Sequence, residues 1–391
     1  MKRKILIILI ITFFTYYKFL FNGFFFEDSH IFRNGYEKTL IKNFYSGYDH
    51  TYEEGEFAYR PLIKIIYVVE KIFFKKNIIL FHLTSLIIHL INIYLSYLVL
   101  KKFKIPERLL FFSILIFALH PVNTEAVIWH SALPDLISYI FLILIIISYL
   151  NFYNTQKKLF LIISLILNFL FILTKENNII IFPIIILLSL YQYFFVKRDN
   201  IKKIVLNILP FFILFIGYFL WLYVIFNYLK FSRGEIQGNI ILIFIKSFVR
   251  KIRMFFLLGY NFNFLNISDK ITDILYLLIL LICVLLIYKY RKELPEILLN
   301  IRKEILFILI TFIILLPNIM VSRKTSGELY SFGFRYLYSS SLFISYLFLK
   351  FIRFEKFKKI YVFIFSMLFL IFSIIAINKI ITIINSKSVL F

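Results

Sequence analysis

Long apolar runs dominate the chain and are separated by short polar stretches. Most of these runs are long enough to form a membrane-spanning helix, because about 20 apolar residues cross a hydrocarbon core of roughly 30 Å. They do not alternate apolar with polar residues, as the strands of a membrane barrel do. The sequence therefore predicts an all-α polytopic helical bundle with about eleven transmembrane helices. These cover residues 5–21, 78–100, 109–119, 136–150, 159–173, 179–196, 204–229, 272–288, 305–321, 337–349 and 360–384.

Two longer polar stretches interrupt the apolar pattern. The first, residues 22–77, is predicted to be a large external loop. It ends in the apolar segment 61–74, whose spaced charges indicate a helix that lies in the membrane interface rather than crossing it. The second, residues 230–271, is predicted to be another external loop. We find no sign of a soluble domain or of tetratricopeptide repeats, so residues 1–391 are predicted to form a single membrane domain.

The composition supports this class. The chain is 61% hydrophobic and carries a formal net charge of +24. In a soluble protein this charge would suggest nucleic-acid binding. Here Lys and Arg cluster between apolar runs, where they set membrane orientation. We therefore exclude nucleic acid as a partner and expect membrane lipids instead. The single cysteine, Cys283, excludes an intramolecular disulfide.

The basic N-terminus, MKRK, predicts that the chain begins on the cytoplasmic side of the membrane. With this orientation the polar stretches fall on one, external face. They are residues 22–77, 120–135, 174–177, 230–271 and 322–338. Convergence of separated polar loops on one side of a bundle is what a site at the membrane surface requires.

Five short motifs then suggest a family. They are YRPL at 59–62, FHLTSLIIHLIN at 81–92, HPVNTEAVIWHSALPDL at 120–136, LTKEN at 173–177 and FRYLY at 334–338. In this order they resemble the membrane half of the transmembrane and tetratricopeptide-repeat O-mannosyltransferases and their bacterial relatives. The resemblance covers residues 20–190 well and 330–350 moderately, and HPVNTEAV followed by PDL is its most specific part.

The resemblance implies a fold and an activity. The family belongs to the GT-C superfamily of glycosyltransferases, which use polyprenyl-phosphate sugar donors. Its pattern implies an acidic pair near an Asn after the first helix, and Glu27, Asp28 and Asn34 match it. This chain departs in having Glu-Asp where two aspartates are usual, and in a one-residue shift of the Asn. The bacterial relatives suggest the inner (plasma) membrane, with an active face that is external or periplasmic.

Sugar transfer from a lipid phosphate to a hydroxyl needs a base for the acceptor proton and positive charge for the departing phosphate. Asp28 is the candidate base, with Glu27 as its partner or substitute. The alternative is that both are ordinary interfacial charges at a helix end. Arg60 and Arg335 are candidate phosphate ligands, because arginine presents a fork that suits phosphate oxygens. Both also fit the alternative of arginines that snorkel beside an aromatic belt.

Further polar residues are candidates for a sugar pocket. Lys175 and Glu176 are expected either to pair with each other or to contact sugar or phosphate, with Lys175 counted among the donor phosphate ligands. His82 and His89 are seven residues apart and are expected to be helix-packing histidines rather than metal ligands. The remaining pocket candidates are His120, Glu125, Asp135 and Tyr338. A divalent cation, Mg²⁺ or Mn²⁺, held by Glu125 and Asp135 with the acidic pair is an open alternative that no spacing demands.

The sequence therefore predicts a GT-C-type membrane glycosyltransferase that inverts the anomeric carbon. The donor would be a polyprenyl-phosphate sugar and the acceptor a protein, lipid or glycan hydroxyl. Two alternatives remain: a transporter (flippase) of lipid-linked glycans, and a catalytically inactive relative. A transporter should carry ionisable residues deep inside its spans. The predicted spans are nearly free of carboxylates, which favours surface chemistry.

Overall fold

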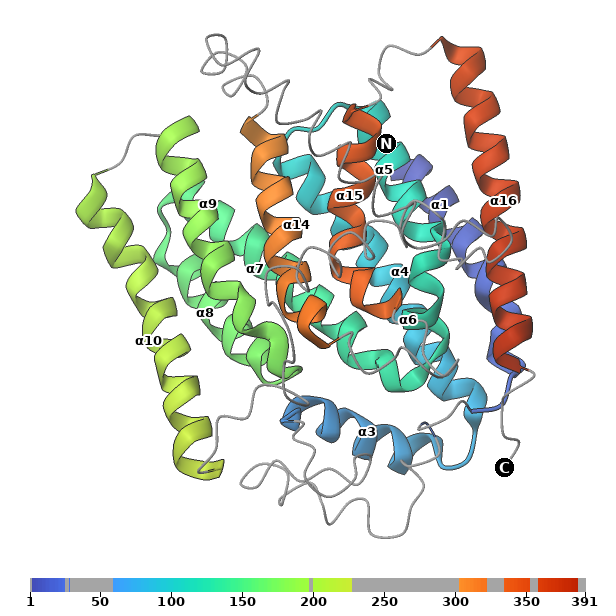
Figure 1. Cartoon of the computed structure of the whole chain (residues 1–391), viewed down its shortest axis with the longest axis horizontal. Helices are drawn as coiled ribbons and strands as arrows, with labels where there is room; N and C mark the ends of the chain where they lie inside the picture. The colour runs from blue at the N-terminus through green and yellow to red at the C-terminus, as the bar shows by residue number, and fades with distance from the viewer. Residues whose placement is uncertain are drawn as a thin grey trace, which may run out of the picture.

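The computed structural model describes residues 2–24, 28, 59–196, 200–226, 302–321, 334–351 and 358–385. Every regular element in these ranges is a helix (Figure 1). Glu27, Asn34, the loop 230–271 and the predicted span 272–288 lie outside the described residues. Predictions that rest on them stay predictions.

Each predicted span inside the described ranges is helical, which confirms a polytopic helical membrane protein. Six helices are long and apolar enough to cross a membrane, or up to seven if one bent pair counts as a span, within the described residues. The predicted total of eleven is therefore not established. The helices of the bundle are α1 (Lys2–Tyr16) continued by η1 (Tyr17–Phe21), α4 (Ile78–Lys102), α5 (Glu107–Leu119), α7 (Leu133–Thr155), α8 (Lys158–Ile172), α9 (Ile181–Phe195), α10 (Ile201–Phe226), α14 (Arg302–Val321), α15 (Tyr338–Phe351) and α16 (Lys359–Asn385).

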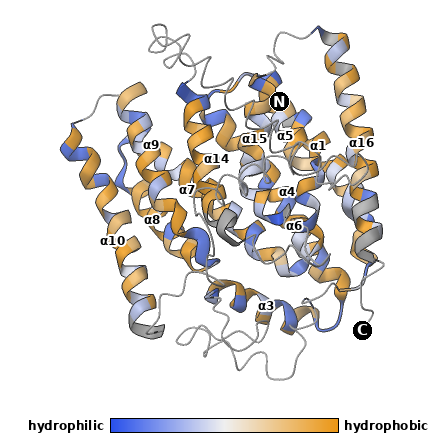
Figure 2. Ribbon diagram, in the orientation of Figure 1, coloured by the Kyte–Doolittle hydropathy of each residue, from blue (hydrophilic) through white to orange (hydrophobic). Residues whose placement is uncertain are grey.

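Helix α3 (Pro61–Phe74) lies across one end of the bundle (Figure 1). It has the bounds of the predicted interfacial helix, and Pro at its first position suits a helix start. Ile63, Tyr67 and Glu70 are buried at helical spacing, whereas Phe73 is 75% exposed on another face. Figure 2 shows α3 as a mixture of hydrophilic and hydrophobic residues, unlike the mainly hydrophobic α10 and α16. One face of α3 therefore packs against the bundle, and another face is exposed.

The predicted loop 120–135 is largely helical. The chain bends by 47° between α5 and the segment that follows, at the peptide between His120 and Pro121. Proline disfavours helical geometry in the residue before it, and His120 is indeed extended. After the bend come the short helices η4 (Pro121–Asn123), α6 (Thr124–Ile128) and η5 (His130–Ala132), and α7 follows directly. We call residues 120–135 the elbow segment.

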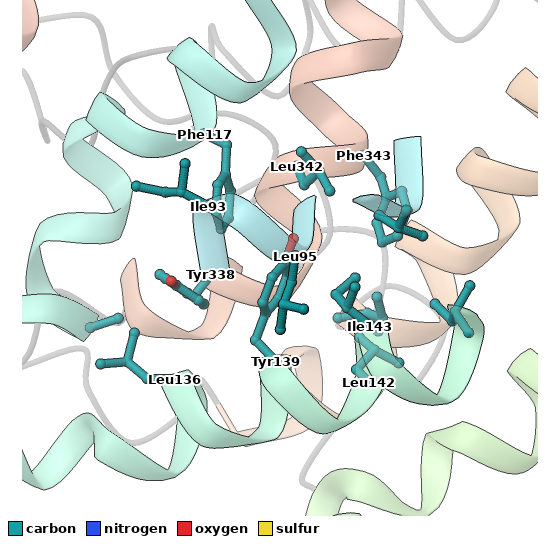
Figure 3. Close-up of a cluster of buried hydrophobic side chains, with 14 of the residues drawn as sticks. Ile93, Leu95, Phe117, Leu136, Tyr139, Leu142, Ile143, Tyr338, Leu342 and Phe343 are labelled. Carbon is teal, nitrogen blue, oxygen red and sulfur yellow. The ribbon is translucent and has the colours of Figure 1, made fainter. Parts of the chain in front are cut away.

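A buried cluster that includes several aromatic side chains joins α4, α5, α7 and α15 in the core (Figure 3). Phe117 stacks on Tyr139 with ring centroids 5.2 Å apart, and both rings contact Tyr338. The Tyr338 hydroxyl lies 2.7 Å from His89 Nδ1 and accepts a hydrogen bond from the Asn92 amide at 3.1 Å. Since His89 Nε2 faces the Ala118 carbonyl at 3.1 Å, Nε2 carries the proton and Tyr338 donates to Nδ1. His89 is thus a helix-packing histidine, as predicted.

Candidate active site

Side-chain contacts bring the separated polar segments to one end of the bundle. Asp28 contacts the elbow segment through Ser131, and the backbone N–H of Arg335 reaches Glu125 Oε2 at 3.4 Å. The turn after α8 joins the same region through its own ion pairs. The convergence on one face that the apolar pattern predicts is therefore present among the described residues.

Asp28 is fully buried, and Ser131 holds it by two hydrogen bonds. The backbone N–H and the hydroxyl of Ser131 both donate to Asp28 Oδ1, at 2.7 and 2.6 Å. Ser131 lies in the first turn of the helical segment that continues into α7, where backbone N–H groups lack intrahelical partners. The two hydrogen bonds orient the carboxylate, and this geometry is equally suited to a helix cap and to a base.

Arg335 is held by aromatic rings. It lies in η8 (Phe334–Leu337), with its guanidinium carbon 4.1 Å from the centre of the Trp129 ring and 5.2 Å from that of Tyr336. Burial opposes the charge, but Tyr336, Glu125 and Asp135 outweigh it and raise the pKa of Arg335. In the plane of the guanidinium, Nη2 donates to the Tyr336 hydroxyl at 3.4 Å. The buried Nε has no hydrogen-bond partner among the described residues.

Lys175 forms a buried ion pair with Asp135. Its Nζ lies 2.5 Å from Asp135 Oδ1, and the two side chains are 7% and 11% exposed. The same Nζ lies 5.1 Å from the centre of the Tyr336 ring. Tyr336 therefore contacts both Lys175 and Arg335, and it brings two cationic groups to one aromatic side chain.

Arg60 and Glu176 form a second ion pair. Arg60 Nε and Nη2 donate to the two carboxylate oxygens of Glu176 at 2.8 and 2.7 Å, a bidentate contact. Lys175 and Glu176 thus pair with other elements rather than with each other. Lys175 has extended backbone angles, φ −159° and ψ 138°. Successive side chains of an extended chain point in opposite directions, so the two neighbours reach different partners.

His120 and Glu125 have local roles in the elbow segment. His120 Nδ1 accepts a hydrogen bond from the backbone N–H of Val122 at 3.2 Å, which caps η4 at the bend. Glu125 is 3% exposed and faces the start of η8. Tyr338 lies one turn beyond Arg335, in the aromatic cluster beneath the site.

Four residues that lie beside the site were not among the predicted site residues. Ser131, Trp129 and Tyr336 hold the predicted base and cations, and Glu70 of α3 pairs with His130 at 2.9 Å. Their signal was weak, because serine and aromatic residues abound in the chain. HPVNTEAVIWHSALPDL does contain Trp129, His130 and Ser131, so the most specific motif marked the correct segment.

No group of three or more His, Cys, Asp or Glu side chains suited to a metal ion lies within the described ranges. Asp135 is paired with Lys175, and Asp28 with Ser131. Glu27 is outside these ranges, so the open alternative of a divalent cation there stays a prediction.

Comparisons with known proteins agree with the motifs. No family model matches the chain. Human protein O-mannosyl-transferase TMTC1 is 28% identical over 146 residues, which is 34% of this chain and 17% of the human protein. Human protein O-mannosyl-transferase TMTC3 is 27% identical over 156 residues, which is 38% of this chain and 17% of that protein.

The structural comparison gives an archaeal enzyme. The crystal structure of the Archaeoglobus fulgidus oligosaccharyltransferase tethered to an acceptor peptide is 14% identical, with a TM-score of 0.46. The match covers 99% of this chain and 55% of that chain. The chain spans only about 17% of the length of the human relatives that it matches. Within those limits, this chain is similar in sequence to the protein O-mannosyl-transferases, as its motifs predicted.

Proposed function

We propose that this chain is a membrane glycosyltransferase of the GT-C type. It would move a sugar from a polyprenyl-phosphate donor to a hydroxyl acceptor, with inversion at the anomeric carbon. One observation carries the proposal: Asp28 and Arg335, a carboxylate and a guanidinium, contact Ser131 and Trp129 of the same elbow segment. These two contact residues are separated by His130 alone, so a base and a phosphate ligand stand close to one short piece of backbone.

The proposed step is a single displacement. Asp28 takes the proton of the acceptor hydroxyl while the acceptor oxygen attacks the anomeric carbon. The bond from that carbon to the phosphate oxygen breaks, and the lipid phosphate leaves with the electron pair. A single displacement inverts the anomeric configuration. Glu27, which adjoins Asp28 in the sequence, is proposed as a second carboxylate of the site.

Arg335 is the proposed ligand of the leaving phosphate. Arg60 and Lys175 each have a carboxylate within 2.7 Å, whereas no described carboxylate lies within 4.0 Å of the Arg335 guanidinium. Trp129 and Tyr336 fix its plane; Nη2 donates to the Tyr336 hydroxyl at 3.4 Å, whereas Nε has no hydrogen-bond partner among the described residues. Preorganised donors of this kind stabilise charge that develops in the transition state. We assign Arg60, Lys175, Asp135 and Glu176 to the positioning of the site.

The relatives suggest where to begin with substrates. Their name describes protein O-mannosyl transfer, so we propose a polyprenyl-phosphate mannose donor and a serine or threonine hydroxyl as the first pair to test. The basic N-terminus and the bacterial character of the resemblance support a site on the external face of a bacterial inner membrane.

The test uses the whole chain, purified and reconstituted in lipid vesicles with polyprenyl-phosphate mannose labelled in the sugar. We expect labelled peptide and free polyprenyl phosphate to appear in equal amounts. Label that crosses the bilayer without release of lipid phosphate would instead indicate a transporter. If neither labelled peptide nor free polyprenyl phosphate appears with any of a panel of sugars and acceptors, the chain is an inactive relative. A parallel assay with a chelator tests the open alternative of a divalent cation.

A further inference from the structure

We propose that α3 is a spacer helix that sets the distance between the two halves of the candidate site, with Glu70, His130 and Arg60 as positioning residues. The inference rests on the proposed function for its catalytic meaning. One half is Ser131 with Asp28. The other is the turn at residues 173–176, whose Lys175 contacts Tyr336, the ring that also contacts Arg335.

The N-terminal end of α3 is attached to the turn at 173–176. Arg60, which immediately precedes the helix, makes the bidentate ion pair with Glu176. The backbone N–H of Leu62 also donates to the Leu173 carbonyl at 3.2 Å. Two attachments on either side of Lys175 fix this turn relative to the first turn of α3.

The C-terminal half of α3 is attached to His130. Glu70 Oε2 accepts a hydrogen bond from His130 Nε2 at 2.9 Å, and the Tyr67 hydroxyl donates to the His130 carbonyl at 3.2 Å. On its other side the His130 ring contacts Ser85 of α4 at 3.2 Å. Both the ring and the backbone of His130 are therefore held, and the next residue is Ser131, which orients Asp28.

The two attachments are a fixed distance apart. Glu70 lies ten positions after Arg60, and at a rise of 1.5 Å per residue a helix spans about 15 Å over that distance. A helix changes its length very little, so both halves of the site keep the spacing that α3 imposes. A displacement of about 1 Å at a reacting group can cost on the order of a hundredfold in rate. Loss of either attachment should therefore lower kcat more than it weakens donor binding.

A purely stabilising role for the Glu70–His130 pair is the alternative. Both side chains are almost fully buried, at 5% and 0% exposure. Well-packed apolar residues often stabilise a protein as well as a buried ion pair does. Unlike apolar packing, however, the hydrogen bond between Glu70 and His130 fixes the orientation of the His130 ring, and it joins α3 to the residue beside Ser131. We therefore assign it to positioning.

Turnover of Glu70→Ala and Glu70→Gln is the first test. Glu70→Ala should lower kcat at least about tenfold, with the KM for polyprenyl-phosphate mannose within about twofold. Glu70→Gln retains an oxygen that accepts from His130 and should recover most of kcat. Tyr67→Phe, which removes one hydroxyl, should lower kcat by a smaller factor. It keeps the proposal testable if Glu70→Ala does not fold. Ile72→Ala, on the exposed face of α3, is the matched control with parental kcat. A parental kcat in folded Glu70→Ala would overturn the proposal. So would an equal decrease of kcat in Glu70→Ala and Glu70→Gln.

A second readout does not depend on sugar transfer. Spin labels on cysteines at Ile72 and Ile91, both exposed, report the distance between α3 and α4 in a Cys283→Ser background. Glu70→Ala should shift or broaden the distance distribution, and Glu70→Gln should leave it as in the parent. An unchanged distribution in Glu70→Ala overturns the spacer role. If the parent transfers no sugar but the distribution still responds, the proposed function fails and the structural role of α3 stands.

Discussion

Asp28 and Ser131 are 103 positions apart in the sequence, yet Ser131 donates both its backbone N–H and its hydroxyl to one oxygen of Asp28. The contact lies at the N-terminal end of a helical segment, where the helix dipole favours an anion. It therefore supports two interpretations, a structural cap and an oriented base. They make different predictions, because a cap needs only an acceptor oxygen and a base needs a carboxylate.

Removing the Ser131 hydroxyl tests how the carboxylate is held. Ser131→Ala keeps the backbone donor and loses the hydroxyl donor, so Asp28 should become less well oriented. A hydrogen bond to a charged group contributes about 1.5–3 kcal/mol. We expect a roughly tenfold loss of kcat and a lower melting temperature, measured by transfer assay and thermal unfolding. Retention of parental kcat would show that the hydroxyl does not orient a reacting group.

Arg335 should not be replaceable by lysine. Lysine keeps the charge but loses the planar fork and the stacking on Trp129 and Tyr336. We expect Arg335→Lys to lower kcat/KM for the lipid-phosphate donor roughly a hundredfold, as for the loss of one oxyanion donor. Lys158→Ala, at the exposed N-terminal end of α8, is the control and should leave kcat/KM unchanged. Full activity in Arg335→Lys would remove the proposed phosphate ligand.

Exchanging Arg60 and Glu176 separates positioning from phosphate binding. Each single change, Arg60→Glu or Glu176→Arg, leaves like charges in contact and should lower the melting temperature. The double exchange restores opposite charges, and the coupling free energy should be roughly 0.5–3 kcal/mol. We also expect the double variant to regain the parental KM for the donor within about threefold. A donor KM that stays high despite restored stability would make Arg60 a phosphate ligand.

Tyr338→Phe tests the aromatic cluster beneath η8. The variant keeps the ring but leaves His89 Nδ1 and the Asn92 amide without the hydroxyl that they share. A buried polar group without its partner costs about 1–3 kcal/mol. The free energy of unfolding should fall by that amount, measured by denaturant titration in detergent. An unchanged unfolding free energy would show that the hydroxyl adds nothing to the packing.

The helix positions could be predicted because the membrane leaves few alternatives. An apolar run as long as 204–229 is typical of a membrane-spanning helix and not of a soluble protein, and α10 (Ile201–Phe226) lies there. The bounds of α3 followed from Pro61 at its start and from spaced charges in an apolar segment. The helical turns of the elbow segment were missed, because helices of three to five residues are too short to show a periodic pattern.

The charge pairs could not be predicted in the same way. Asp135 meets Lys175 across 40 positions, and Arg60 meets Glu176 across 116. Which carboxylate meets which cation depends on how helices pack and on local backbone geometry, such as the extended conformation of Lys175. The motifs identified the correct segments, and the tertiary structure decided the partners.

Asp28→Asn gives the most direct test of the central claim that Asp28 acts as a base at a site shared with Arg335. The amide oxygen can still accept from Ser131, so the variant should fold and bind the donor equally well, although loss of the negative charge at the helix N-terminus should lower its melting temperature slightly. Single-turnover release of polyprenyl phosphate should fall by about 10²–10⁴-fold, the usual contribution of a general base. Release at the parental rate from folded Asp28→Asn would contradict the account and leave Asp28 as a helix cap.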